Sequence, residues 1–340
     1  MRVMQIMAGS EHGGAEAFFE RLTLALHRDG LPQRAVIRRN RERAQHLARE
    51  GVPVTQLPFG GPPDLYTRWR IGREIAAWSP DVVLAWMSRA AVKTPRSRTV
   101  VCARLGGYYD LKYYRHFDHL IGNTEDIVAY IRKQGWPAER AHYLPNFVSA
   151  KRSEPLDRAA FATPRDAPLL IALGRLHTDK AFDVLIDALA EVPGAYLWVA
   201  GSGPEEKALR NRVAGHDLDA RVRFLGWRQD IEAILAAGDI FLCPSRIEPL
   251  GNVVIEAFAQ GLPVIAAASH GPVSLIEDGV SGLLAPIDDA KALAAAINRM
   301  IADQALRYAL AREGFATYQR QFTEAAVVAN YRAFFEKVRR

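Results

Sequence analysis

Short apolar segments alternate with amphipathic segments along the whole chain. An apolar run of about four to eight residues between turn residues is typical of a buried strand, whereas apolar positions at i, i+3, i+4 and i+7 predict a helix. We expect strands near residues 2–8, 34–38, 52–57, 81–86, 98–103 and 119–122, and again near 168–174, 195–200, 221–225, 239–243, 262–267 and 282–284. Helical spacing between most of them, as at 180–192, predicts an α/β fold with parallel sheets covered on both faces.

The two series of strands predict two Rossmann-like domains, because 340 residues exceed one ordinary core. Serine, threonine and proline residues break the periodicity between 146 and 167, so we place the boundary there, with domains at 1–150 and 151–324. The segment from Thr323 to Arg340 is predicted to be a helix. Its apolar side carries Val327, Val328, Tyr331, Phe334 and Phe335.

Composition places the chain among globular proteins, with 49% hydrophobic and 24% charged residues. No apolar run reaches the ~18–20 residues that a membrane span needs, and the first residues lack the features of a secretory signal. Cys102 and Cys243 both lie in apolar strand patterns, which predicts buried free thiols in a reducing compartment. We therefore expect a cytoplasmic protein.

Positive charge is concentrated in the first half of the chain. Residues 1–150 contain 22 Lys and Arg against 14 Asp and Glu, a net charge of +8, whereas residues 151–340 contain 22 against 24, a net charge of −2. This asymmetry indicates an anionic partner for the first domain, for which nucleic acid, an anionic membrane surface or a phosphorylated glycan would each serve. The alternative is an arginine-rich composition with no partner.

Glycine-containing turns follow three of the predicted strands. Gly13 and Gly14 open a helix after the first strand, where free backbone amides can hold an anion, or where the glycines simply make a tight turn. Arg175 and Lys180 flank the end of the strand near 168–174; two cations there suit a diphosphate, and a solvated basic loop is the alternative. The third turn, at Gly201, is interpreted as a structural turn near the ligand.

Glu248 and Glu256 lie eight positions apart around a turn that leads from an apolar strand into a helix. A glycine turn at a helix start suits an anion, and the two carboxylates add acceptors for hydroxyl groups. Glu256 lies off the buried stripe of its helix and near the helix start, so its side chain can lean toward a ligand there. Favourable interaction with the helix dipole also explains Glu256, but it does not explain Glu248.

Taken together, these motifs resemble the retaining glycosyltransferases of the GT-B fold, glycosyltransferase family 4. The resemblance covers nearly the whole chain and is strongest at Glu248 to Glu256, which matches the family's Glu-x7-Glu. Further matching segments are Gly13 to Glu16, Gly174 to Leu176 with Lys180, Gly201 to Pro204, Phe224 to Trp227, Ala237 to Ile240, Pro244-Ser245 and Gly261 to Ala266.

The resemblance implies two domains facing across a cleft, with the final helix crossing back to the N-terminal domain. The C-terminal domain would bind the nucleotide-sugar donor and the N-terminal domain the acceptor. Arg175 and Lys180 would hold the diphosphate, Glu256 the ribose, and Glu248 the donor sugar, so Glu248, Arg175 and Lys180 are the expected catalytic residues. The remaining donor contacts implied are Gly13, Gly14, Gly201, Trp227, Arg228, Leu250, Gly251 and Asn252.

Two positions depart from the family pattern. Ala181 replaces the glycine that usually follows the lysine, which is tolerable if the backbone there is already helical. No histidine aligns with the one that the family often places in the N-terminal domain. The expected acceptor contacts are therefore His12, Arg104, Tyr108 and Tyr109.

The function implied is retaining transfer of a sugar from a UDP- or GDP-linked donor to a glycan or lipid-linked acceptor, in lipopolysaccharide or other envelope polysaccharide synthesis. Such enzymes typically need no metal, and no His/Cys cluster at ligand spacing is present, so neither metal nor cofactor is expected. Tyrosines near Lys112 and Arg115 fit peripheral contact with an anionic membrane at its inner face, or they form part of the core. Nucleic acid is not expected as a partner. The alternatives are a same-fold nucleotide-sugar 2-epimerase and a non-catalytic sugar-binding protein.

Overall fold

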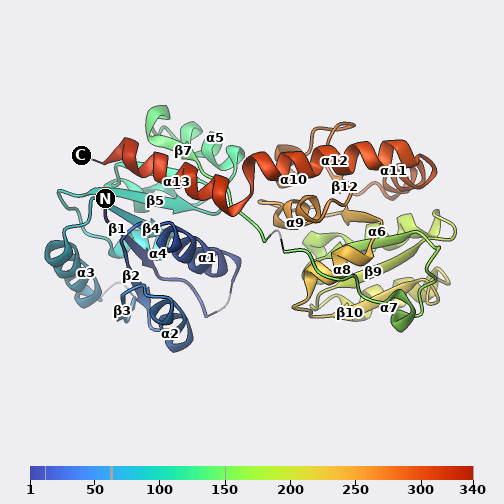
Figure 1. Cartoon of the computed structure of the whole chain (residues 1–340), viewed down its shortest axis with the longest axis horizontal. Coiled ribbons are helices and arrows are strands. Elements are labelled where there is room, and N and C mark those ends of the chain that lie inside the picture. The colour runs from blue at the N-terminus through green and yellow to red at the C-terminus, as the bar shows by residue number, and fades with distance from the viewer. Residues whose placement is uncertain (12, 62–63, 150, 340) are drawn as a thin grey trace. The chain divides into compact units, whose positions relative to one another are not determined.

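The computed structural model describes residues 1–11, 13–61, 64–149 and 151–339, and it divides the chain into two compact units (Figure 1). The first unit comprises Met1–Asn146 together with Glu324–Arg340, and the second comprises Phe147–Thr323. Each unit contains one parallel sheet with helices on both faces, so the predicted α/β class is confirmed. Within the described ranges, no helix is long and apolar enough to cross a membrane.

The first unit holds a seven-stranded parallel sheet in the order β3-β2-β1-β4-β5-β6-β7. Its strands are β1 Val3–Met7, β2 Gln33–Arg38, β3 Val54–Leu57, β4 Val82–Trp86, β5 Val100–Leu105, β6 His119–Gly122 and β7 Ala141–Tyr143. Its helices are α1 Gly14–Arg28, α2 Arg41–Arg49, α3 Leu65–Trp78, α4 Met87–Lys93, α5 Glu125–Lys133 and α13 Glu324–Val338, with short 3-10 helices η1 Leu111–Tyr114 and η2 Ala138–Arg140. The sequence pattern did not predict β7, which is three residues long and carries no apolar run.

Alternate residues of the first sheet serve two cores, as the pleat of a strand requires. Met4 and Ile6 of β1 pack with residues of α3, α4 and α5 on one face. On the other face, Trp86 of β4 packs edge-on against Phe19 of α1, with ring centroids 5.4 Å apart. Both faces of the sheet are therefore apolar, which explains why its strands read as continuous hydrophobic runs.

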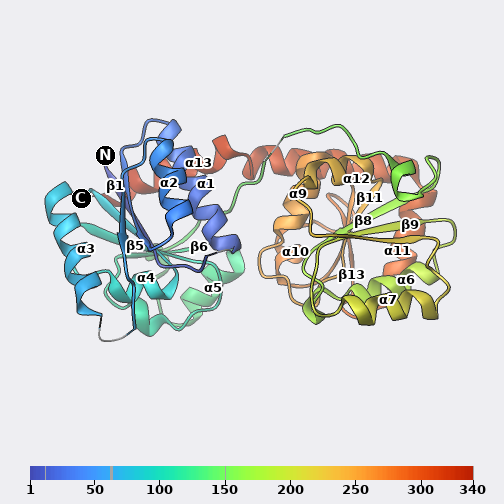
Figure 2. The ribbon, with the colours of Figure 1, turned by 90° about the horizontal axis from the view of Figure 1, so that it is seen from below.

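The final helix, α13, belongs to the first unit, as predicted (Figure 2). Arg28 and Asp29 at the end of α1 form ion pairs of 2.7 Å with Glu324 and Arg332 of α13. The five residues predicted for its apolar side are all buried: Val327, Val328, Tyr331, Phe334 and Phe335. The chain thus completes its first unit with its last helix.

The second unit holds a six-stranded parallel sheet in the order β10-β9-β8-β11-β12-β13. Its strands are β8 Leu169–Leu173, β9 Tyr196–Ala200, β10 Val222–Gly226, β11 Ile240–Cys243, β12 Val264–Ala267 and β13 Leu283–Ala285. Its helices are α6 Phe182–Ala190, α7 Glu206–Gly215, α8 Ile231–Ala237, α9 Asn252–Gln260, α10 His270–Leu275, α11 Ala290–Ala302 and α12 Gln304–Gln321, with short 3-10 helices η3 Arg158–Phe161 and η4 Thr178–Lys180.

The strand order of the second sheet reverses between β8 and β11. β9 and β10 lie on one side of this pair, and β12 and β13 lie on the other. In open parallel sheets, ligands bind outside the carboxyl ends of the strands at such a switch point, because the two following loops diverge there. The loops that follow β8 and β11 are therefore the first place to look for a functional site. In the first unit, the equivalent pair is β1 and β4.

Candidate functional site

The loops after β8 and β11 bring Lys180 and Glu248 into direct contact. Lys180 ends the 3-10 helix η4, and its Nζ donates to Glu248 Oε2 at 2.6 Å. The Glu248 side chain is 10% exposed and that of Lys180 is 24% exposed, so this is a partly buried ion pair. The Glu248 carboxylate also accepts from Ser245 Oγ at 3.4 Å and from the Gly251 amide at 3.3 Å. A lysine and a glutamate proposed for different parts of the donor are thus each other's partners here.

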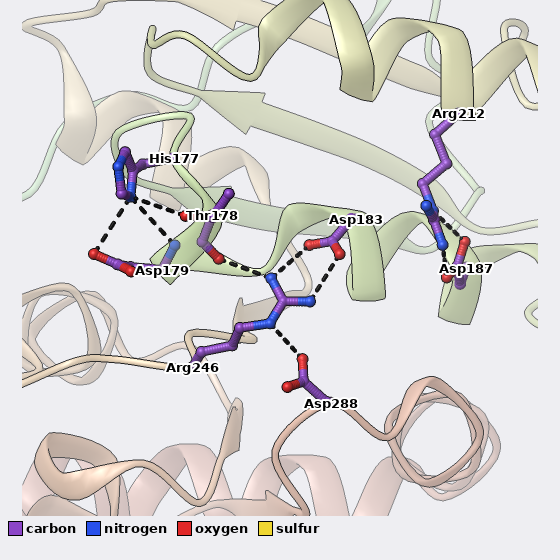
Figure 3. Close-up of polar contacts among 8 residues, drawn as sticks. All are labelled: His177, Thr178, Asp179, Asp183, Asp187, Arg212, Arg246 and Asp288. Carbon is purple, nitrogen blue, oxygen red and sulfur yellow. Dashed lines mark hydrogen bonds and ion pairs between the residues drawn. The ribbon is translucent and has the colours of Figure 1, made fainter.

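Arg246 links the loop after β11 to η4, α6 and the loop after β13 (Figure 3). Its guanidinium donates to both carboxylate oxygens of Asp183 on α6, at 2.9 and 2.7 Å, and to the Thr178 carbonyl at 2.7 Å. Its Nε lies 2.5 Å from Asp288 Oδ1, in the loop after β13. Burial alone would raise the pKa of Asp183. The hydrogen bonds and positive charge of Arg246 outweigh burial and hold that pKa below its ordinary value. Arg246 therefore fixes the spacing between the loop that carries Lys180 and the loop that carries Glu248.

The sequence analysis missed this role of Arg246. The available signal was its place two residues before Glu248, directly before the segment with the strongest resemblance. Its acidic partners are far away in sequence, at positions 183 and 288, so no local spacing pointed to them.

Gly201 and Gly203 allow the loop after β9 to pack against the loop after β8. A Cβ on Gly201 would lie 1.8 Å from the Gly174 carbonyl oxygen, and one on Gly203 would lie 2.2 Å from that of Leu176. The Leu176 amide in turn donates to the Ser202 carbonyl at 3.0 Å. These contacts agree with the interpretation of the Gly201 turn as a structural turn. Arg175 stands between the two packed positions with an exposed side chain that has no hydrogen-bond or ion-pair partner among the described residues.

The start of α9 forms the second wall of the site. Gly251 is its N-cap residue, with φ 69°, a left-handed conformation that glycine adopts without strain, and it has no side chain to cap the first amides. Gly271 packs on this turn, since its amide donates to the Glu248 carbonyl at 2.7 Å. Glu256 is half-buried on the first turns of α9, whereas Val254 and Phe258 point into the core. Leu250 and Asn252 flank Gly251 and are both half-buried.

Trp227 and Arg228 follow β10 at the same edge of the sheet. The Trp227 side chain is 77% exposed, which is unusual for so large an apolar group. Arg228 is held by Asp230, with its Nε 2.8 Å and its Nη2 2.5 Å from the two carboxylate oxygens. An exposed indole beside a fixed guanidinium offers a planar surface for a ring.

Ala181 has a left-handed backbone, with φ 52° and ψ 36°, between η4 and α6. The sequence analysis accepted an alanine at this position on the condition that the backbone is helical, and that condition is not met. A left-handed conformation costs a non-glycine residue roughly 1–2 kcal/mol. The glycine that the family usually places here is therefore explained by conformation, and this chain bears strain next to Lys180.

The glycine loop of the first unit is folded around Glu16. The Glu16 carboxylate is buried and accepts from the Ser10 amide at 2.7 Å and from the Ser10 hydroxyl at 3.1 Å. A Cβ on Gly13 would lie 2.3 Å from Glu16 Oε2, so any side chain at this position would displace the Glu16 carboxylate. Nothing lies within 4 Å of a Cβ on Gly14, which is exposed. His12 lies outside the described residues.

Arg104 is buried among aromatic side chains of the first unit. It is 2% exposed, and its guanidinium lies 4.8 Å from the ring centroids of both Phe18 and Trp86. Its Nε donates to the Tyr331 hydroxyl at 2.9 Å, and its Nη2 donates to Asn146 Oδ1. Cation–π contacts and hydrogen bonds therefore link Arg104 on β5 to α1, β4 and α13, and the expected contact of Arg104 with the acceptor stays a prediction.

The tyrosines near residue 110 differ from one another. Tyr108 is 46% exposed and bonds to Asp126; burial and that carboxylate raise the pKa of Tyr108 to about 12. Tyr109 is half-buried, and burial, partly offset by Arg104, raises its pKa. Tyr113 is 40% exposed, whereas Tyr114 is fully buried. The core alternative thus holds for Tyr114, and Tyr108, Tyr109 and Tyr113 stay accessible.

Two further expectations concern metals and thiols. Among the residues that the structure describes, no group of three or more His, Cys, Asp or Glu side chains is arranged to hold a metal ion. Cys102 and Cys243 are buried free thiols, as predicted, and burial raises the pKa of Cys243 to about 12. Neither thiol is therefore a nucleophile at neutral pH.

Comparison with known proteins gives consistent matches over both units. Residues 12–152 match the family described as Glycosyltransferase Family 4, and residues 167–303 match Glycosyl transferases group 1. The chain is 36% identical over 344 aligned positions to the lipopolysaccharide core biosynthesis glycosyltransferase LpsE of Rhizobium meliloti, covering 97% of this chain and 98% of that protein. It is also 36% identical to LpsD of the same organism, covering 99% and 98%. The crystal structure of HepE from Anabaena in complex with UDP superposes with a TM-score of 0.87 at 22% identity, over 99% of this chain and 100% of HepE. This likeness confirms the predicted two-domain fold.

Proposed function

The chain belongs to the group 1, family 4 glycosyltransferases, and we propose that it transfers a sugar from a UDP-linked donor to the growing core of lipopolysaccharide. Its glycosyltransferase class follows from the family. Lipopolysaccharide core as the acceptor pathway is supported by LpsE and LpsD, both similar over nearly their full length and both named for that pathway. Uridine as the base is supported by the UDP in the HepE crystal structure.

The observation that carries this proposal is the partly buried Lys180–Glu248 ion pair at the switch point of the second sheet. When a diphosphate arrives, Lys180 and Arg175 offer it positive charge, and the first turn of α9 offers backbone amides. Lys180 then turns from Glu248 to the phosphate, which frees the Glu248 carboxylate to accept hydrogen bonds from the hydroxyls of the donor sugar. The ion pair thus keeps both groups in place until the donor replaces it.

The chemistry proposed is electrostatic. As the bond between the sugar and the phosphate breaks, negative charge grows on the leaving diphosphate, and Lys180, Arg175 and the helix end stabilise it. We propose that the anomeric configuration is retained by a reaction on one face of the sugar and that no metal is needed. Glu248 is not assigned as a covalent nucleophile, because the proposed reaction on one face of the sugar forms no bond between the sugar and the enzyme.

Glu256 is proposed to bind the ribose, and Trp227 with Arg228 to border the base. The half-buried position of Glu256 near the start of α9 and the exposed indole of Trp227 support these roles. Gly201 acts indirectly, by letting two loops meet, and the amides near Leu250, Gly251 and Asn252 contribute contacts to sugar and phosphate.

A thermal-shift and product assay tests the proposal. UDP-sugars, in buffer containing EDTA, are expected to raise the melting temperature of the protein, and a truncated core oligosaccharide is expected to gain one sugar with release of UDP. Lys180→Met and Glu248→Gln should each slow transfer at least about 100-fold, whereas Glu206→Gln, which removes an exposed charge on α7, should leave it unchanged. No shift with any UDP-sugar, or a strict need for a divalent metal, would contradict it.

The same assay separates the alternatives. A nucleotide-sugar 2-epimerase would return an epimerised donor without any acceptor, whereas a transferase releases UDP and free sugar slowly under those conditions. A non-catalytic sugar-binding protein would give neither product. Membership of a glycosyltransferase family favours the transferase.

Peripheral contact with the anionic inner face of the cytoplasmic membrane is proposed to involve α3. Leu65, Tyr66 and Trp69 on this helix are 72%, 54% and 58% exposed. Arg68 and Arg73 are exposed beside them, and aromatic side chains next to cations are typical of proteins that rest on an anionic bilayer.

Sedimentation with phosphatidylglycerol vesicles tests this contact. The double variant Leu65→Ser with Trp69→Ser should bind the vesicles at least tenfold more weakly, since burial of one large apolar side chain contributes about 1.5–3 kcal/mol and about 1.4 kcal/mol corresponds to tenfold. Tyr308→Ser, a change at an equally exposed position of the second unit, serves as the control. Equal binding by both variants would show that α3 does not face the bilayer.

A further inference from the structure

A cavity of about 750 Å³ opens at the carboxyl edge of the first sheet. It is lined by the segments that follow three neighbouring strands: Gly9 to Glu11 after β1, Arg38 to Arg43 at the end of β2 and start of α2, and Pro58 after β3. Its volume is in the range of small-molecule sites, about 300–1,000 Å³. Its place at the carboxyl ends of parallel strands is where such sheets bind ligands.

Three arginines dominate this cavity. Arg38, Arg39 and Arg41 line it with exposed side chains, and none of the three side chains has a hydrogen-bond or ion-pair partner among the residues described. The cavity wall also holds two exposed carboxylates, Glu11 and Glu42, so three guanidinium groups face two negative charges. Guanidinium groups bind phosphate oxygens in a bidentate manner, and unpaired ones gathered in a hollow are suited to a phosphoryl group.

The fourth arginine, Arg43, builds the cavity. It is 5% exposed, and its Nε donates to Glu20 of α1 at 2.7 Å. Its Nη1 and Nη2 donate to the carbonyls of Ser10 at 3.4 Å and Glu11 at 3.0 Å. A buried guanidinium thus fastens the glycine loop to α2, so the arginine-lined wall and the glycine loop are held as one body.

We propose that this cavity binds a phosphomonoester carried by the acceptor saccharide, so that the first unit selects a phosphorylated acceptor. The inference rests on the proposed function, because it assigns the acceptor to the first unit, but it concerns binding and does not require turnover. It also accounts for part of the +8 charge of residues 1–150, which the donor site in the second unit leaves unexplained.

The test measures binding of a water-soluble, delipidated core oligosaccharide to the full chain by calorimetry. The sample of oligosaccharide is divided into two portions. One portion keeps its phosphates, and the other is treated with a phosphatase. The unchanged protein should bind the phosphorylated form about 10- to 100-fold more tightly, because hydrogen bonds to charged groups contribute about 1.5–3 kcal/mol each. The triple variant Arg38→Gln, Arg39→Gln, Arg41→Gln should lose this preference.

A charge-matched triple variant of the same unit controls for net charge: Arg96→Gln, Arg115→Gln, Lys133→Gln, all at exposed positions outside the cavity. It should keep the preference. If circular dichroism shows that the triple variant folds poorly, Arg39→Lys is a milder change. It keeps the positive charge but removes the planar guanidinium that binds phosphate in a bidentate manner, so the preference for the phosphorylated form should weaken.

Three outcomes would overturn the inference. These are equal binding of both oligosaccharides by the unchanged protein, a preference that survives the Arg38/Arg39/Arg41 triple variant, or a triple variant that loses only its binding to phosphatidylglycerol vesicles. The last outcome would assign the arginines to lipid headgroups. A clear phosphate preference without any sugar transfer would instead count against the proposed function and leave this site standing.

Discussion

Replacing Glu248 by glutamine should strengthen the binding of UDP while it slows sugar transfer. In the free protein, Lys180 Nζ is committed to Glu248 Oε2 at 2.6 Å. UDP must draw Lys180 away from that carboxylate, and it carries no sugar whose hydroxyls the carboxylate can bind in return. Glutamine keeps the size of Glu248 and one acceptor oxygen but removes the negative charge, so Lys180 meets the diphosphate without a competing carboxylate.

The expected gain follows from the burial of the pair. Unit charges about 3 Å apart attract by about 5 kcal/mol at an effective dielectric constant of about 20. Loss of hydration by two groups that are only 10% and 24% exposed offsets most of this attraction, which leaves about 1–2 kcal/mol. A free energy of 1.4 kcal/mol corresponds to about tenfold in affinity, so the Kd of UDP should fall about five- to thirtyfold. Transfer should fall about 100- to 1,000-fold, as when one pre-organised polar contact is removed from an active site.

Titration calorimetry with UDP, in the unchanged protein and in Glu248→Gln, measures the first effect, and initial rates with a UDP-sugar measure the second. Glu206→Gln on α7, which removes an exposed charge paired with Arg210, should change neither quantity. If Glu248 acts only as an anchor for its loop, the glutamine variant will loosen that loop and bind UDP more weakly. Weaker or unchanged UDP binding would therefore refute the ion-pair exchange.

Three further predictions follow from the contacts described. Ala181→Gly should raise the free energy of unfolding by up to about 1 kcal/mol in urea titration, because relief of the left-handed strain exceeds the loss of one buried methyl group; a decrease would contradict this. Arg246→Met should lower that free energy by about 2 kcal/mol and reduce transfer at least tenfold, since Asp183 and Asp288 lose their partner, and unchanged kinetics would show that the loops need no clamp. Burial, with the neighbouring His119, lowers the pKa of His142 from 6.5 to about 4. Between these pH values the unfolded chain binds a proton that the folded chain does not. The free energy of unfolding should therefore fall by about 1–2 kcal/mol as the pH drops from 6.5 to 4. His142→Phe should flatten this pH dependence, and an equally steep profile in that variant would contradict the assignment.

The strands of both sheets could be predicted from sequence because nearly all of them are buried on two faces. β8 is a run of five buried apolar residues, for example, and its alternate positions serve different cores. β7 was not predicted because it is three residues long and its His142 and Tyr143 are only half-buried. Burial on both faces therefore determines how visible a strand is in the sequence.

Site residues could be predicted where they directly follow an apolar strand. Their contacts could not be predicted, because the partner residues lie far away in the sequence. Lys180 and Glu248 stand out because each lies in a loop after an apolar run, although no pattern revealed that they pair. For Arg104, the sequence position predicts a ligand contact but gives no sign of its contacts with Phe18, Trp86 and Tyr331. No sequence periodicity reveals a buried cation surrounded by aromatic rings, because its partners come from three separate elements, β4, α1 and α13.

The return of α13 to the first unit bears on the order in which this protein folds during synthesis. Domains generally fold as they leave the ribosome, the N-terminal one first. Here residues 147–323 are translated before Glu324, so the second unit has all of its chain while the first still lacks a helix. Until Tyr331 is made, Arg104 has no hydroxyl to bond, and the face of the sheet that α13 covers stays open to water and to chaperones. The unit that is translated first is thus the one completed last, and a ribosome that stops early releases a finished second unit attached to an unfinished first.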